Sequence, residues 1–161
     1  MNIPFSPPDI SDNEIDEVID TLKSGWITTG PKTKKFENDI TSYCGSAKTA
    51  CLSSATTSLE MTLRILGIGK GDEVIVPAYT YTTSCSVICH VGATPVIVDS
   101  QKDNVEMDYD LMADAITEKT KVIIPVDIAG ILCDYDKIFE IIESKKDLFN
   151  PNSELQEIFN R

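Results

Sequence analysis

Three short runs of β-branched residues, each set between segments of helical periodicity, constrain the fold more than any other feature of this sequence. They are Val-Ile-Val at 74–76, Val-Ile-Val at 96–98 and Val-Ile-Ile at 122–124. Uninterrupted apolar runs are typical of strands covered on both faces, and strands that alternate with helices pair in parallel. The sequence therefore predicts an α/β fold with a mainly parallel sheet and helices on both of its faces.

The flanking residues extend this pattern along the chain. We predict strands at 47–52, 72–78, 94–100 and 121–130, and helices at 55–69, 81–92, 107–116 and 134–146. Two further helices precede the alternation, at 11–25 and 30–45. Ser11 and Glu14 have the spacing of a capping box at the start of the first, and Gly25 and Gly45 are placed to end the two helices.

Charge and hydropathy exclude two classes of partner. The 26 acidic and 14 basic residues give a formal net charge of −12, which repels nucleic acid phosphates and anionic membrane surfaces. No apolar run approaches the ~20 residues that span a bilayer, and Met1 does not start a basic segment followed by an apolar one. We therefore expect a cytoplasmic protein with neither nucleic acid nor membrane as a partner.

The five cysteines favour reduced, packed thiols over a disulfide framework, because their number is odd and no CxxC pair occurs. Cys85, Cys89 and His90 lie close together in the sequence and could bind a metal ion. A closed zinc site needs four ligands, however, and the sequence offers no complementary cluster. We expect packing roles for these residues and no metal.

The segment Ser-Ser-Ala-Thr-Thr at 53–57 joins a predicted strand to a predicted helix. At such a turn small residues let the chain approach a ligand, while free N–H groups and the helix dipole favour an anion. Ser54, Thr56 and Thr57 add hydroxyl donors, so the segment indicates a phosphate site. The competing interpretation is that these residues only cap and pack the helix. The segment matches neither a P-loop nor a GxGxxG fingerprint.

Two tyrosines, Tyr79 and Tyr81, follow the next predicted strand. An aromatic face at the mouth of the sheet can stack on the ring of a planar ligand. The competing interpretation is partial burial of the rings with the hydroxyls in water. Beside a phosphate site, the tyrosines predict a flat, phosphorylated heterocycle as the ligand.

Several long segments in the right order resemble the DegT/StrS family of sugar aminotransferases. They are SGWITTGPKTKKFE, SSATTSLEMTLRILGIGKGDEVIVPAYTYTTS, VGATPVIVD and KVIIPVDIAG. The resemblance implies the aspartate-aminotransferase (type I) fold and the cofactor pyridoxal 5'-phosphate (PLP). It also implies that residues 1–161 form the N-terminal part of the PLP-binding large domain.

Applied position by position, the resemblance implies roles for eight residues. Ala55 and Thr56 would contact the cofactor phosphate, and Tyr81 would stack on the pyridine ring. The substrate pocket would be lined by Trp26, Thr28, Thr29, Gly30 and Asp127. Two structural roles stay open: Trp26 as a hydrophobic anchor beside a tight turn, and Asp127 as a cap of the following segment.

PLP chemistry requires a Schiff-base lysine and an acid beside the pyridine nitrogen, and neither is identified in this sequence. None of the twelve lysines is predicted at the ligand-binding edge. The family places both groups on strands that would follow Arg161. We therefore expect no catalytic residue in this chain, which would be a truncated N-terminal fragment, inactive by itself and binding PLP weakly or not at all.

For the full-length enzyme, the resemblance implies transfer of an amino group, commonly from glutamate, through PLP to a nucleotide-linked keto-sugar. The products would serve the synthesis of surface polysaccharides or antibiotic sugars, and the enzyme would be a homodimer. A related branch with histidine in place of the lysine dehydrates the sugar instead. The sequence also leaves open a non-catalytic module that binds PLP or a nucleotide sugar for regulation, and an unrelated nucleotide-binding α/β domain.

Overall fold

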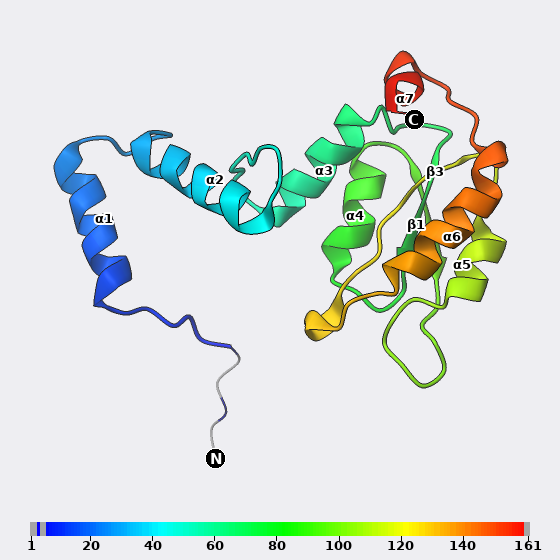
Figure 1. Ribbon diagram of the computed structural model, residues 1–161, viewed down its shortest axis with the longest axis horizontal. Helices are drawn as coiled ribbons and strands as arrows, with labels where there is room; N and C mark the ends of the chain where they lie inside the picture. The colour runs from blue at the N-terminus through cyan, green and yellow to red at the C-terminus, as the bar shows by residue number, and fades with distance from the viewer. Residues whose placement is uncertain (1–2, 4–5, 160–161) are drawn as a thin grey trace. The chain divides into compact units, whose positions relative to one another are not determined.

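The computed structural model describes residue 3 and residues 6–159. The chain divides into two compact units (Figure 1), Met1–Cys51 and Leu52–Arg161. We call them the N-terminal unit and the sheet unit. Within the described ranges, no helix has the length and apolar character needed to cross a membrane.

The N-terminal unit contains the two helices predicted from the capping pattern. Helix α1 spans Asp12–Ser24 and helix α2 spans Pro31–Cys44. The capping box is present, with the Ser11 N–H donating to Glu14 Oε2 at 2.6 Å. Gly25 and Gly45 end the two helices in the left-handed conformation, as predicted. Neither helix has a buried residue.

The strand predicted at 47–52 is wrong. This segment has irregular backbone and belongs to none of the strands of the described sheet. Side chains of α2 bind it instead of a neighbouring strand, because the Cys51 N–H donates to Glu37 Oε1 at 3.0 Å and Thr41 Oγ1 donates to Thr49 Oγ1 at 2.8 Å. The segment 53–57 therefore follows an irregular stretch and not a strand.

The sheet unit contains a three-stranded parallel sheet. Its strands are β1 (Glu73–Pro77), β2 (Thr94–Val98) and β3 (Thr120–Ile123), in the order β2-β1-β3. The helices are α3 (Ala55–Ile65), α4 (Thr82–His90), α5 (Tyr109–Ala115) and α6 (Tyr135–Lys145). The last predicted strand is shorter than expected, since β3 ends at Ile123 and only the Ile124 N–H continues the pairing, to Ile75 O at 2.8 Å.

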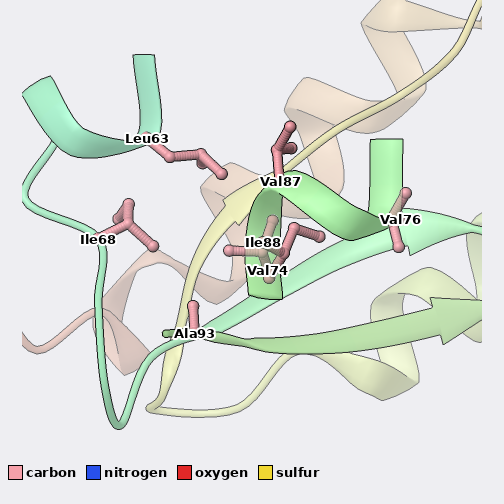
Figure 2. Packing of buried hydrophobic residues seen from close by; sticks show 7 residues of the cluster. All are labelled: Leu63, Ile68, Val74, Val76, Val87, Ile88 and Ala93. Atoms are coloured by element: carbon pink, nitrogen blue, oxygen red, sulfur yellow. The ribbon is translucent and has the colours of Figure 1, made fainter. Parts of the chain in front are cut away.

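Helices cover both faces of the sheet, as the continuous apolar runs predicted. The alternation of side chains along β1 sends Val74 and Val76 to one face and Ile75 to the other. Figure 2 shows the first cluster, in which Val74 and Val76 pack with Leu63, Ile68, Val87, Ile88 and Ala93. Ile75 packs with a second cluster made of Val98, Met107, Met112, Cys133, Ile138 and Ile141. Helices α3 and α4 thus cover one face and α5 and α6 the other (Figure 1).

The segment 150–159, which we call the strap, was not predicted as structured. It follows the short 3-10 helix η2 (Lys146–Leu148) and contains helix α7 (Glu154–Phe159). Asp72, only 1% exposed, accepts hydrogen bonds from Asn152 Nδ2 at 2.5 Å and from Gln156 Nε2 at 3.0 Å. Gln156 is itself 2% exposed and also donates to Gly67 O at 3.1 Å. These buried bonds fasten the strap beside the start of β1.

Candidate functional site

The candidate residues of the sheet unit lie at the carboxyl edge of the sheet. Strands β1 and β3 are parallel neighbours, so both chains leave the sheet at the same edge. Strand β1 leads into α4, and β3 leads into the short 3-10 helix η1 (Ile128–Gly130). Figure 1 shows η1 and the start of α4 at the same end of the sheet. This is the edge at which α/β proteins bind their ligands.

The first turn of α3 has free N–H groups at its N-terminus. Ser54 is the N-cap, and its Oγ accepts the Thr57 N–H at 3.1 Å. The Thr57 hydroxyl lies 3.0 Å from Ser54 Oγ and 3.2 Å from Ser53 Oγ. The N–H groups of Ala55 and Thr56 have no acceptor among the described residues. Ser54 and Thr57 therefore cap the helix, and two backbone donors remain for an anion.

Thr56 is not part of this cap. Its Oγ1 lies 3.4 Å from Thr83 Oγ1, in the first turn of α4. The side chain is half-buried, so the two threonines join the N-terminal turns of two helices on one face of the sheet. Both helix dipoles have their positive ends at this junction, which favours a negative charge there. Thr83 was not among the residues predicted from the sequence, although its place in the Tyr-Thr-Thr segment after the strand marked it as a further hydroxyl at the same edge.

Tyr81 presents its ring to solvent from a fixed backbone. It is the N-cap of α4 and its carbonyl accepts the Ser84 N–H at 3.0 Å, while Ser84 is buried and bonds Thr80 through its hydroxyl at 2.8 Å. Tyr81 is 79% exposed and Tyr79 is 57% exposed. Tyr79 is therefore partly buried, whereas Tyr81 is largely accessible. Tyr81 is therefore a free aromatic surface at the residue before α4.

The Trp-Ile-Thr-Thr-Gly loop belongs to the N-terminal unit and forms a tight turn. The indole Nε1 of Trp26 donates to Thr29 O at 3.0 Å. A Cβ atom on Gly30 would lie 2.4 Å from that nitrogen, so glycine is required where the ring crosses the chain. Trp26 is still 57% exposed and lines a cleft of about 380 Å³ together with Thr28 and Gly30. The loop thus forms the tight turn that was predicted beside Trp26 and also lines an accessible cleft. Thr29 takes part in the turn through its carbonyl, which accepts the indole N–H of Trp26.

Asp127 lies four residues beyond the end of β3 and is exposed. Its Oδ1 accepts the Cys133 N–H at 2.9 Å, and the Tyr135 hydroxyl lies 3.1 Å from Oδ1 and 3.0 Å from Oδ2. The Cys133 N–H lowers the pKa of the Asp127 carboxyl, and the Tyr135 hydroxyl adds to this effect. The carboxylate makes no capping bond to η1 but holds the more distant Cys133 and Tyr135, and it remains accessible at the same time.

The lysines of the described residues lie mostly in helices or before strands. Lys102 differs, because it lies in the exposed loop that follows the carboxyl end of β2. Carboxylate partners raise the pKa of the amines of Lys32, Lys34, Lys35 and Lys146. A raised pKa keeps an amine protonated and unreactive toward an aldehyde.

The sequence cluster Cys85, Cys89 and His90 does not come together around a common point. Cys85 packs against the first core cluster, and His90 Nδ1 lies 3.0 Å from Glu60 Oε2 of α3. Over the described ranges, no three His, Cys, Asp or Glu side chains are arranged to hold a metal ion.

The fold and the ligand-binding edge of the sheet define the class of protein. The structural neighbours are aminotransferases with the type I fold of PLP enzymes. The parallel sheet, covered on both faces by helices, agrees with this fold. A family model described as the DegT/DnrJ/EryC1/StrS aminotransferase family matches residues 8–149. The chain belongs to this family.

Two solved structures and one further relative show the degree of similarity. A Streptococcus pneumoniae protein named as a sugar aminotransferase, solved in its PLP form, is 64% identical with a TM-score of 0.95, over 100% of this chain and 41% of that one. A UDP-4-amino-4-deoxy-L-arabinose–oxoglutarate aminotransferase of Shewanella sediminis is 44% identical over 89% of this chain and 37% of its own length. An aminotransferase of Psychrobacter cryohalolentis is 34% identical with a TM-score of 0.82, over 89% of this chain and 37% of that one. This chain thus spans about two fifths of the length of these relatives.

Proposed function

We propose that this chain forms the part of a PLP-dependent sugar aminotransferase that holds the phosphate of the cofactor and covers its ring. The observation that carries the proposal is the junction of Thr56 and Thr83, at 3.4 Å, between the N-terminal turns of α3 and α4. The free N–H groups of Ala55 and Thr56 lie in the same turn. Two hydroxyls and two backbone donors suit a phosphate group, whose oxygens only accept at neutral pH.

The residues present fit PLP in charge, and they offer its ring an aromatic surface. The N-terminus of one helix stabilises an anion by about 0.3–1 kcal/mol, and here two helix N-termini meet. The exposed ring of Tyr81 at the start of α4 supplies a surface for a planar heterocycle next to this anion site. PLP, when bound, supplies the electron sink for the transfer of amino groups. The residues of this chain bind and orient it.

The groups that complete the reaction are proposed to come from sequence beyond Arg161. These are the lysine that binds the aldehyde and the acid beside the pyridine nitrogen. The relatives, which are more than twice as long as the matched part, have room for them. Residues 1–161 would then be the N-terminal part of the PLP-binding large domain.

The proposed substrates are a nucleotide-linked keto-sugar and glutamate as the amino donor. The name of the Shewanella sediminis relative, which contains a UDP-linked amino sugar and oxoglutarate, supports both. Trp26, Thr28, Thr29, Gly30 and Asp127 are proposed to line the substrate pocket of a homodimeric enzyme. Its role in making surface polysaccharides or antibiotic sugars and its place in the cytoplasm stay predictions from the sequence.

The experiment that tests the proposal is a PLP titration of the full-length enzyme and its variant Thr56→Leu. Leucine removes the hydroxyl and fills the junction with Thr83, so the dissociation constant of PLP should rise about tenfold to a hundredfold. The matched control is Thr62→Leu on the same helix, where the exposed hydroxyl only bonds to Ser58 O at 2.8 Å. Equal PLP affinity in Thr56→Leu and in the control would overturn the proposal.

A further inference from the structure

The segment between β3 and α6 is closed on itself around the side chain of Asp127. Ala129 and Gly130 both have positive φ, at 54° and 80°, which reverses the chain after η1. The reversal brings the Cys133 N–H and the Tyr135 hydroxyl back to the carboxylate of Asp127. Ala129 is strained in this region of the backbone, so the surrounding bonds must hold the turn.

The donors to Asp127 are anchored in the core. Cys133 is 5% exposed and packs in the second core cluster, and Tyr135 is the first residue of α6, whose Ile138 and Ile141 belong to the same cluster. On the other side, the Asp134 N–H donates to the Tyr109 hydroxyl at 2.7 Å, and that hydroxyl donates to Glu106 Oε2 at 2.5 Å. Two buried side chains of α6 and a second tyrosine therefore fix the C-terminal end of the loop that carries an exposed carboxylate.

The bonds around Asp127 leave it capacity for a ligand. A carboxylate has about four acceptor positions on its two oxygens. Oδ1 accepts the Cys133 N–H and shares the Tyr135 hydroxyl with Oδ2, so Oδ2 keeps at least one position. Burial, followed by the Asp127 carboxylate, raises the pKa of the Tyr135 hydroxyl, so Tyr135 keeps its proton and its role as donor.

We infer that Tyr135 is a positioning residue of the site: its hydroxyl holds the Asp127 carboxylate in one orientation at the carboxyl edge, as a fixed acceptor for a hydroxyl or ammonium group of the substrate. This inference rests on the proposed function, since Asp127 is there assigned to the substrate pocket. A freely rotating carboxylate would lose side-chain entropy each time a substrate binds. Because Tyr135 already orders the carboxylate in the free protein, less entropy is lost on binding. Tyr135 itself need not touch the substrate.

The first part of the test needs no substrate. The titration of the Asp127 carboxyl carbon is followed by ¹³C NMR in the chain and in Tyr135→Phe, which lacks only the hydroxyl. Because the hydroxyl stabilises the ionised carboxylate, its removal should raise the pKa of Asp127. The matched control is Tyr109→Phe, which removes a hydroxyl of α5 that bonds Asp134 and Glu106 and makes no bond to Asp127. It should move the titration of Asp127 less than Tyr135→Phe does.

The second part measures amino transfer to a UDP-linked 4-keto sugar by the full-length enzyme with PLP. Tyr135→Phe should raise KM for the sugar about threefold to tenfold, with kcat and PLP affinity nearly unchanged. Asp127→Asn should raise KM more, and Tyr135→Phe should add little in its presence. An unchanged Asp127 titration, an unchanged KM or an equal effect of Tyr109→Phe would each overturn the inference. A different outcome separates this inference from the proposed function. If Tyr135→Phe raises the pKa of Asp127 but neither the wild-type enzyme nor any variant transfers an amino group, the proposed function fails and the effect of Tyr135 on Asp127 stands.

Discussion

The hydroxyl oxygens of Thr56 and Thr83 lie 3.4 Å apart and join the first turns of α3 and α4. The two residues are 27 positions apart in the sequence, and the first core cluster keeps their helices together through Leu63, Val87 and Ile88. The apolar packing on one face of the sheet therefore determines the geometry of the proposed phosphate site. Substitutions in that packing should disturb the site indirectly, whereas substitutions of the threonines should act on the ligand alone.

The ring of Tyr81 should contribute to the affinity for PLP without contributing to folding. Its side chain is 79% exposed, so Tyr81→Ala removes little buried surface. A stacking contribution of about 1 kcal/mol predicts a roughly fivefold to tenfold rise in the dissociation constant of PLP in the full-length enzyme. The unfolding midpoint should stay within experimental error.

The control is Tyr43→Ala, since Tyr43 is also highly exposed, at 89%, and lies in the N-terminal unit. Fluorescence titration with PLP and thermal unfolding would measure both quantities for the two variants. Loss of PLP affinity in Tyr43→Ala, or none in Tyr81→Ala, would contradict the assignment of the ring.

The lysines of residues 1–161 should react alike with PLP. An exposed amine with a pKa near 10.4 is free in only about one molecule in a thousand at neutral pH. Ion pairs raise the pKa of several lysines further, Lys32 among them. After incubation with PLP and reduction with borohydride, peptide mass spectrometry should find scattered, low labelling.

A transamination assay of the same chain with glutamate should show no turnover. Lys102 is the position to inspect first, because its loop follows the carboxyl end of β2. Stoichiometric labelling of Lys102 or of any other single lysine would place the reactive amine within these residues and contradict the proposal that it lies beyond Arg161.

The strap should depend on the buried carboxylate of Asp72. In Asp72→Asn the new amide group would face the donors Asn152 Nδ2, Gln156 Nε2 and the Gly69 N–H, so at least one buried donor would lose its acceptor. We expect the free energy of unfolding to fall by about 2–4 kcal/mol and the strap amides to exchange faster. Chemical denaturation and hydrogen exchange measure the two effects.

Gly67→Ala tests the same contact from the other side. A Cβ at position 67, where φ is +72°, would lie 2.7 Å from Ser153 Oγ and 2.9 Å from Leu155 Cβ. Gly67→Ala should therefore also loosen the strap, so that its amides exchange faster. The exposed control Asp110→Asn on α5 should leave the exchange of the strap amides unchanged. Normal protection of residues 150–159 in both Asp72→Asn and Gly67→Ala would show that these contacts do not hold the strap.

Most of the fold could be predicted because local patterns and packing agree. The caps of α1, the glycine that ends α2 and the three apolar runs are each confirmed, since every one of them is specified by neighbouring residues. The strand expected at 47–52 is wrong because a short apolar stretch does not show whether a strand lies beside it. Here the α2 side chains of Glu37 and Thr41 bind it instead.

The candidate site was only partly visible in the sequence. Small hydroxyl residues at 53–57 indicated an anion site, but the sequence could not separate the capping hydroxyls of Ser54 and Thr57 from that of Thr56. The partner of Thr56 lies on another helix, so only the packed structure identifies Thr83. The strap escaped prediction for a similar reason, because its contacts with Asp72 span about 80 residues of sequence.

Helix α1 should drive self-association of residues 1–161. Its residues Ile15, Val18, Ile19 and Leu22 form one apolar stripe, and each is at least 41% exposed. Light scattering should show a mean mass that rises with protein concentration. Val18→Gln with Leu22→Gln should reduce this rise, and Asn13→Gln, on the opposite side of the helix, should not. A single monomeric mass at all concentrations would contradict the prediction.

The most direct measurement compares the binding of PLP and of pyridoxal, which lacks the phosphate, to the full-length enzyme and to Thr56→Leu. If Ala55, Thr56 and Thr83 form the phosphate site, the wild-type enzyme should bind PLP much more tightly than pyridoxal. Thr56→Leu should weaken PLP about tenfold or more and leave the affinity for pyridoxal nearly unchanged. An equal loss of affinity for both ligands, or a loss for neither, would contradict the assignment of the phosphate to the junction of α3 and α4.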